Sequence, residues 1–225
     1  HAASAFFASP FESSAILTID GVGEWSTAAI GQGRGNRLEL HHEMCFPHSV
    51  GLLYSAFTQF TGFKVNSGEY KMMGLAPYGE AIYADLIKEK IVRIYDDGSI
   101  RLNLDYFDFL RGRCMTSEAF AGAFGGPPRA QGAPITRREM DISRSIQEVV
   151  EQIVIGMAGH AKQITGEEHL CVAGGVALNC VANGALVREN LFDKVWIQPA
   201  AGDAGAALGA ALDAYYTLLH APRVI

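Results

Sequence analysis

The stretch TIDGVGEWST, residues 18–27, has the residue types of a phosphate-binding hairpin. Asp20 stands where a β-rich run ends, and Gly21 and Gly23 would let the backbone approach an anion closely. An ordinary Asp-Gly hairpin turn accounts for the same pattern about equally well. The residues of this stretch leave both interpretations open.

The stretch AGGVALN, residues 173–179, indicates a strand that ends in Gly174-Gly175 and is followed by a helix. Free backbone N–H groups at a helix N-terminus favour phosphate or adenosine binding, and the Asn179 amide could both donate and accept hydrogen bonds. A tight strand-to-helix turn with a packing glycine is the alternative. It is the stronger reading of an isolated Gly-Gly pair, although the ends of parallel strands are a common place for ligands.

Charged residues in two further stretches could complete such a site. Asp203 lies after a predicted strand at the start of a predicted helix, where an N-cap is the simpler reading. Asp203 and Asn179 end adjacent strand–loop–helix units, so we expect them to face the same cleft. In NSGEYKMMGLAPYG, residues 66–79, Glu69 could hold a ribose diol and Lys71 a phosphate. A helix end with solvated charges explains these two residues equally well.

Hydrophobic patterning predicts the elements that must position these residues. Three β-rich runs in residues 15–46 predict an antiparallel meander, and Asp97-Gly98 predicts the turn of a later hairpin. Thr136 and Glu139 fit a capping box. The long helix that it would begin carries an apolar stripe formed by Ile142, Ile146, Val149, Val150, Ile153, Val154, Met157 and Ala161.

The predicted order is β-β-β-α-β-α-β-α with an insertion at about residues 81–133. Three meandering strands followed by alternating helices and strands predict an α/β fold with a mixed sheet covered by helices. This order resembles the ribonuclease-H-like lobe that is duplicated in actin-like ATPases. Internal sequence repeats are not visible.

Composition narrows the range of partners. The formal net charge is −6 and the basic spots are short, which argues against nucleic acid as a ligand. No apolar run reaches the roughly 20 residues of a membrane span, so we expect no membrane partner. The four cysteines form no CxxC pair, which disfavours structural zinc, and we expect buried thiols at Cys171 and Cys180 in a reducing cytoplasm.

Four segments together resemble the O-carbamoyltransferase family of nodulation and antibiotic-tailoring enzymes. They are HAASAFFASPFESSAILTIDGVGEW, FPHSVGLLYSAFTQFTGFKVNSGEYKMMGLAPYG, VAGGVALNCVANG and QPAAGDAGAALGAAL. The resemblance covers nearly the whole chain and its motifs are specific. A weaker kinship joins GGVALN and GDAGAALGA to the universal threonylcarbamoyl-adenosine transferases, which share the actin-like fold.

The resemblance implies a two-step reaction. A separate carboxy-terminal lobe makes carbamoyl adenylate from ATP and carbamoyl phosphate, and the actin-like lobe transfers the carbamoyl group to a hydroxyl of a sugar or secondary metabolite. The actin-like lobe binds a divalent metal through an HxxxH pair and aspartates. Mixed histidine and carboxylate ligands suit iron, manganese or zinc without choosing between them. The resemblance assigns no catalytic base, and a homodimer is left open.

Residue by residue, the resemblance implies metal ligands at His1, which matches the second histidine of HxxxH, at Asp20 of the DGVGE motif and at Asp203. It implies nucleotide contacts from Gly174, Gly175 and Asn179, and from Glu69 and Lys71 of the GEYK stretch. Gly21 and Gly23 belong to the proposed phosphate-binding hairpin.

The chain matches mostly the second lobe of the actin-like domain. We expect the first histidine of HxxxH, the amino-terminal lobe and the adenylate-forming lobe to lie outside it, so we predict an empty metal site and no transfer activity for these residues alone. Two alternatives stay open at this point. One is an actin-fold sugar kinase in which Asp20 holds magnesium, and the other is a nucleotide-binding module without catalysis.

Overall fold

The first three strands form the predicted antiparallel meander. In the computed structural model, which describes residues 1–23, 25–112 and 114–223, β1 (Ser13–Ile19) pairs with β2 (Ser26–Arg34), and β2 pairs with β3 (Arg37–Cys45). β1 is buried along most of its length, whereas β3 carries charged, exposed residues, as edge strands commonly do.

Two parallel strands complete the sheet, which confirms the predicted mixed α/β arrangement. β6 (His169–Ala173) and β7 (Lys194–Ile197) extend it in the order β3-β2-β1-β6-β7. β1 runs parallel to β6, with Thr18 opposite Ala173. The loops that follow these two strands therefore leave the sheet side by side at the same edge.

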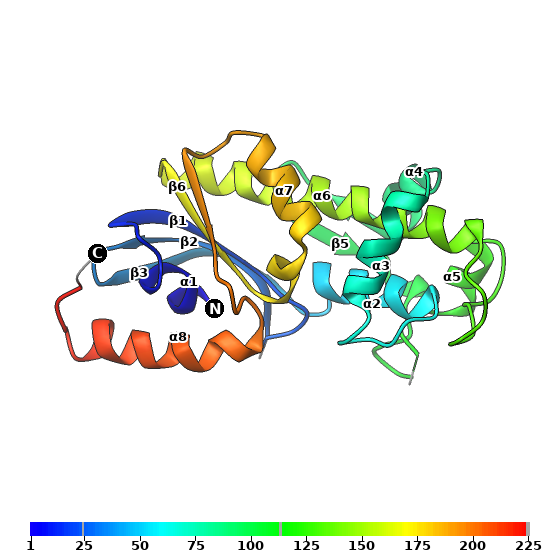
Figure 1. The fold of residues 1–225 in the computed structure, drawn as a ribbon, viewed down its shortest axis with the longest axis horizontal. Coiled ribbons are helices and arrows are strands. Elements are labelled where there is room, and N and C mark those ends of the chain that lie inside the picture. The colour runs from blue at the N-terminus through cyan, green and yellow to red at the C-terminus, as the bar shows by residue number, and fades with distance from the viewer. Residues whose placement is uncertain (24, 113, 224–225) are drawn as a thin grey trace. The chain divides into compact units, whose positions relative to one another are not determined.

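Helices cover both faces of this sheet (Figure 1). α1 (Ala2–Phe7) and α8 (Ala206–Asp213) lie along one face, and α7 (Cys180–Arg188) lies on the opposite face with the C-terminal part of α6 (Arg137–Thr165). The core between α1 and the sheet is formed by Ala5, Phe6, Phe7, Phe11, Ile16, Cys171 and Ala173. The strands, α1, α7, α8 and the end of α6 belong to a first compact unit, which is formed by residues 1–51, 96–99 and from 154 onward.

The long helix α6 forms for the reasons that its sequence predicts. The Glu139 carboxylate accepts a hydrogen bond from the Thr136 backbone N–H at 2.9 Å, which is one half of a capping box. The predicted apolar stripe is buried at every position from Ile142 to Ala161. Within the described residues, no helix combines the length and apolar composition that crossing a bilayer requires.

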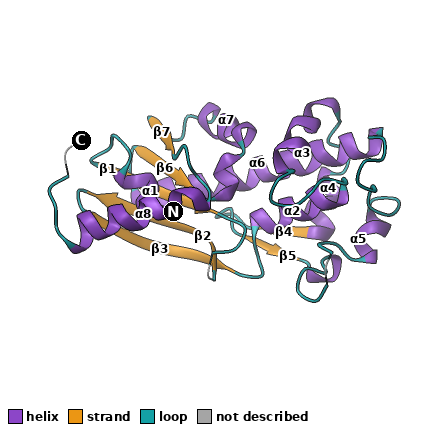
Figure 2. Ribbon diagram, turned by 60° about the horizontal axis from the view of Figure 1, so that its bottom comes forward, coloured by secondary structure: helices purple, strands orange, loops and turns teal. Residues whose placement is uncertain are grey.

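A second compact unit consists of residues 52–95 and 100–153 (Figure 2). Its helices besides α6 are α2 (Val50–Phe60), α3 (Glu69–Leu75), α4 (Ala84–Leu86) and α5 (Glu118–Ala123). β4 (Val92–Ile94) and β5 (Ile100–Leu102) form the predicted hairpin. Its core is aromatic, with ring centroids 4.7 to 5.8 Å apart among Phe57, Phe60, Phe120 and Phe124.

Two local predictions need correction. The helix predicted directly after Gly174-Gly175 is interrupted, because a short 3-10 turn (Gly175–Leu178) comes first and α7 begins only at Cys180. Cys180 is exposed rather than buried, since it occupies the first turn of α7, whereas Cys171 on central strand β6 is buried as predicted.

The contact between Gly33 and Phe6 can be tested by adding one methyl group. A Cβ at Gly33 of β2 would lie 2.5 Å from the Phe6 ring, so Gly33→Ala must displace α1 or the strand. We expect a loss of about 1–3 kcal/mol of unfolding free energy in urea denaturation. Gly74→Ala is the control, because a Cβ there meets no heavy atom within 4 Å, and it should not destabilise helix α3. An unchanged unfolding midpoint for Gly33→Ala would contradict this packing of α1.

Candidate metal centre

His1, Asp20 and Asp203 meet in the first unit. One potential ligand atom from each of the three lies within 4.8 Å of the others. His1 Nε2 is 2.7 Å from Asp20 Oδ2 and 3.7 Å from Asp203 Oδ1. His1 precedes the first residue of α1, Asp20 follows β1, and Asp203 lies in the loop after β7. The fold thus brings together all three residues for which the resemblance implies metal binding.

Backbone groups from two loops hold the Asp20 carboxylate in place. Its Oδ1 accepts hydrogen bonds from the N–H groups of Gly21, at 2.8 Å, and Gly175, at 3.1 Å. The Asp20 N–H donates to the Thr27 carbonyl, and the Ser49 hydroxyl donates to the Asp20 carbonyl. With Oδ1 fixed in this way, Oδ2 faces His1.

The electrostatics of the pair favour two opposite charges. The hydrogen bond to His1 is the main cause that lowers the pKa of Asp20 to about 2, with help from the N–H groups of Gly21 and Gly175 and against the effect of burial. The same hydrogen bond raises the pKa of His1 above its ordinary value, again against the effect of burial. The Asp20 carboxylate is therefore ionised at any physiological pH.

Asp203 differs from the other two residues in its exposure. Its side chain is 96% exposed, whereas those of His1 and Asp20 are 17% and 16% exposed. It is the first residue of a short 3-10 turn (Asp203–Gly205) whose N-cap is Gly202, and Gly205 occupies the N-cap of α8. The helix-capping interpretation of Asp203 is therefore wrong, and its carboxylate is available to a ligand.

The donor set fits a divalent transition metal. One imidazole nitrogen and carboxylate oxygens from two aspartates converge, and iron, manganese and zinc all accept such ligands. His1 Nδ1 is buried without a hydrogen-bond partner among the described residues. The imidazole is therefore oriented through Nε2, the nitrogen that faces the two carboxylates.

The glycines near this cluster have local structural roles. Gly174 has a φ of +95°, and a Cβ there would lie 2.2 Å from the Ile19 carbonyl, so only glycine lets the loop after β6 approach β1. Gly23 closes the hairpin, because a Cβ there would lie 2.8 Å from the Ser26 carbonyl. Gly21 is open, since a Cβ there would meet no atom within 4 Å. Glu24, the last residue of the DGVGE motif, lies outside the described residues.

Two other predicted nucleotide contacts also have partners within the fold, and a third is exposed. The Asn179 Oδ1 accepts from the Ala182 N–H at 3.0 Å and so caps α7. Glu69 belongs to the second unit. Its carboxylate accepts hydrogen bonds from the Ser55 hydroxyl and from the N–H groups of Asn66 and Gly68, which lie just before α3. Lys71, on α3, is exposed.

Sequence reasoning missed Ser49, which lies one residue before α2. Its hydroxyl donates to the carbonyls of Asp20, at 3.1 Å, and Gly21, at 2.5 Å. A serine directly before an apolar helical run is a recognisable N-cap signal. Nothing in its own sequence neighbourhood indicates that its hydroxyl fixes the hairpin after β1.

Comparison with known proteins assigns the chain to a family. The sequence profile described as the carbamoyltransferase N-terminus matches residues 1–212. The chain belongs to the carbamoyltransferase family. This assignment agrees with the resemblance carried by the four sequence segments.

Relatives of this chain are considerably longer. The chain is 56% identical over its full length to the uncharacterized protein sll1178 of Synechocystis, of which it covers 37%. It is 41% identical to nodulation protein NolNO of Sinorhizobium fredii and 39% identical to nodulation protein NolO of Bradyrhizobium diazoefficiens. Each of these two matches covers 94% of the chain, and they cover 29% and 36% of the relatives. The chain thus spans about a third of the relatives that it matches.

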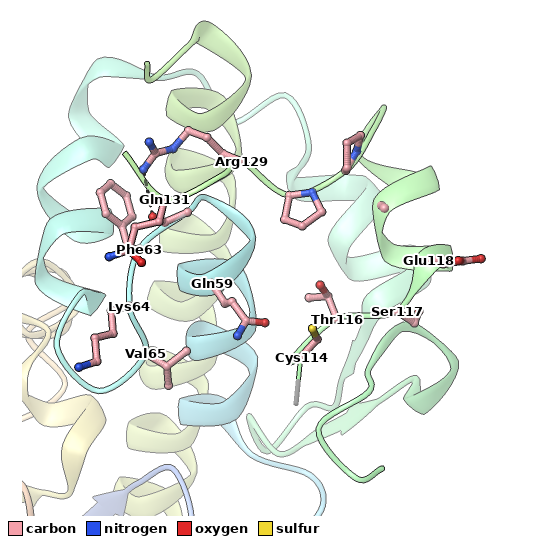
Figure 3. Close-up of a pocket in the computed structure, with 14 residues that line it drawn as sticks. Gln59, Phe63, Lys64, Val65, Cys114, Thr116, Ser117, Glu118, Arg129 and Gln131 are labelled. Atoms are coloured by element: carbon pink, nitrogen blue, oxygen red, sulfur yellow. Dashed lines mark hydrogen bonds between the residues drawn. The ribbon is translucent and has the colours of Figure 1, made fainter. Parts of the chain in front are cut away.

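The second unit of the chain contains a pocket of about 750 Å³ (Figure 3). Gln59 lies across from Thr116, and the Gln59 Oε1 accepts from the Met115 N–H, which ties the two sides together. The Arg129 guanidinium donates hydrogen bonds to the carbonyls of Thr61, Gly62 and Ala133. Lys64 and Arg129 are the cations among the described lining residues, and the second of them already donates to backbone carbonyls. We assign this pocket no part in phosphate binding.

The pH dependence of stability can report on the His1–Asp20 pair. The lowered pKa of Asp20 contributes stability above about pH 4 that is lost as the pH falls towards 2. The raised pKa of His1 contributes stability below about pH 6.5 that is lost as the pH rises through the folded-state value. Asp20→Asn should therefore destabilise the metal-free protein most between pH 4 and 6.5, by up to about 2 kcal/mol.

Thermal unfolding across the pH range provides this measurement. Asp203→Asn is the matched control, because its side chain is almost fully exposed and its loss should leave the profile nearly unchanged. A stability difference between wild type and Asp20→Asn that does not vary with pH would show that the two side chains are not paired.

Proposed function

We propose that this chain is the metal-binding part of an O-carbamoyltransferase, which transfers a carbamoyl group from carbamoyl adenylate to a hydroxyl of a sugar or secondary metabolite. The observation that carries the proposal is the convergence of His1, Asp20 and Asp203. These residues come from three distant parts of the sequence, and all of them lie within the segment that matches the carbamoyltransferase profile.

His1, Asp20 and Asp203 would hold the divalent ion, and iron, manganese or zinc fits the donor set. When bound, such an ion supplies a Lewis acid that polarises a carbamoyl oxygen or orients an adenylate phosphate. The chain prepares this role by keeping Asp20 ionised and by fixing its Oδ1 on two backbone N–H groups. Asp203 is free to move onto a ligand because its side chain is exposed.

The nucleotide would approach from the hairpin after β1. Gly21 supports this proposal because no atom of the chain occupies the space beside its Cα, so a phosphate could come close. Gly23, Gly174, Gly175 and Asn179 are further proposed contacts. Within the fold the Gly175 N–H donates to Asp20 and the Asn179 Oδ1 accepts from the Ala182 N–H. The nucleotide contacts of Glu69 and Lys71 remain predictions from the family resemblance.

We further propose that the first unit is a ribonuclease-H-like lobe of an actin-like fold. The strand order β3-β2-β1-β6-β7, with an antiparallel meander followed by two parallel strands, supports this assignment. The adenylate-forming step from ATP and carbamoyl phosphate would then be carried out by another part of the longer protein. The 225 residues by themselves should accordingly fail to transfer a carbamoyl group.

Substitution of the three ligands tests the proposal in the full-length protein. His1→Ala, Asp20→Asn and Asp203→Asn should each weaken Mn²⁺ binding at least about 10-fold. Each should also lower the transfer of ¹⁴C from carbamoyl phosphate to a panel of sugars in the presence of ATP, by about 100-fold or more. Asp213→Asn is the control, because this aspartate of α8 accepts a hydrogen bond from Thr217 and is not one of the three proposed ligands. Full transfer activity in Asp20→Asn would refute the proposal.

A further inference from the structure

Arg223 lies outside the segment that matches the carbamoyltransferase profile, and it contacts helix α1. Its guanidinium donates to the carbonyls of Phe6, at 2.7 Å, and Ser9, at 3.1 Å, which lie at the C-terminal end of α1 and just beyond it. It also donates to the carbonyl of Phe11 at 2.9 Å and lies 3.5 Å from that of Gly35. One side chain thus joins the end of α1 to the segment before β1 and to the turn after β2.

The same guanidinium covers the aromatic side chains of α1. Its Cζ lies 4.3 Å from the centre of the Phe6 ring and 5.7 Å from that of Phe7, distances at which a cation is attracted to a ring. Phe6 lies against Gly33 of β2, where no side chain intervenes. Phe6 is therefore held both by the sheet and by Arg223.

Helix α1 needs such external contacts. It has only six residues, and a helix of this length is unstable without tertiary packing. His1 stands at its N-cap, where its carbonyl accepts from the Ala5 N–H at 3.0 Å and from the Ser4 hydroxyl at 2.7 Å. A shift of α1 therefore moves His1 relative to Asp20, to which its imidazole is hydrogen-bonded.

We propose that Arg223 is a positioning residue for the metal centre, which fixes α1 on the sheet so that His1 faces Asp20. This inference rests on the proposed function for the identity of the site, but the placement of α1 can be measured without any metal. Arginine suits the task because its planar group carries several N–H donors that reach separate carbonyls at once. A lysine at this position would satisfy fewer of them.

Two measurements on Arg223→Met test the proposal, because methionine keeps an apolar stem and removes the guanidinium. The first is hydrogen–deuterium exchange of peptides that cover residues 1–10 in the metal-free protein, which should become faster. The second is Mn²⁺ affinity at a temperature where all variants are folded, which should fall about 10-fold, as for other residues that orient a metal ligand. The absorption spectrum of bound Co²⁺ should change as well, because it reports ligand geometry.

Two further variants serve as controls. Arg223→Lys should restore part of the Mn²⁺ affinity. Arg93→Met removes an arginine of the second unit that also lies over an aromatic ring, at 5.0 Å from the Tyr95 centre, and it should change neither measurement. Unchanged exchange in Arg223→Met, or faster exchange with unchanged Mn²⁺ affinity, would overturn the proposal.

His1→Ala separates this inference from the proposed function. If His1→Ala binds Mn²⁺ as tightly as wild type, the metal assignment of His1 is wrong and the proposed function fails. The exchange of residues 1–10 then still decides whether Arg223 holds α1 in place.

Discussion

The hydrogen bonds to the Asp20 carboxylate are the interaction on which the candidate site depends. Oδ1 is held by N–H groups from the loops after β1 and β6, and Oδ2 is directed to His1. Charged acceptors make stronger hydrogen bonds than neutral ones, so this arrangement is strongest while Asp20 is ionised. Its lowered pKa ensures that it is. Two loops and the start of a helix are thus joined through one carboxylate.

Parallel pairing of β1 and β6 makes this arrangement possible. The Gly175 N–H reaches Asp20 because both loops leave the same edge of the sheet and because Gly174 adopts a φ of +95° beneath the Ile19 carbonyl. The Gly174 N–H in turn donates to the Ala201 carbonyl, which anchors the loop after β7 at the same place. The Gly-Gly pair therefore has a structural function in assembling the aspartates, whether or not it also contacts a nucleotide.

Sequence patterns predicted the elements better than their ends or the contacts between them. The meander, the two parallel strands and the stripe of α6 follow from local periodicity and capping signals, which the structure confirms. The grouping of His1, Asp20 and Asp203 came from resemblance, because no local pattern reports which chain segments meet in space. The same limit explains the missed role of Ser49, whose hydroxyl acts on a turn far away in the sequence.

The candidate metal ligand His1 stands at the N-terminus of a short helix, so its position depends on the rest of the fold. α1 cannot fix His1 by its own backbone hydrogen bonds, since six residues form fewer than two helical turns. Its position is set instead by contacts from distant elements. The Gln198 amide donates to the Ser4 carbonyl, and Gly209 of α8 lies directly against Ser4. Each of these contacts joins α1 to a part of the chain that is distant in sequence. The candidate metal centre can therefore form only when the sheet, α1 and α8 have folded together.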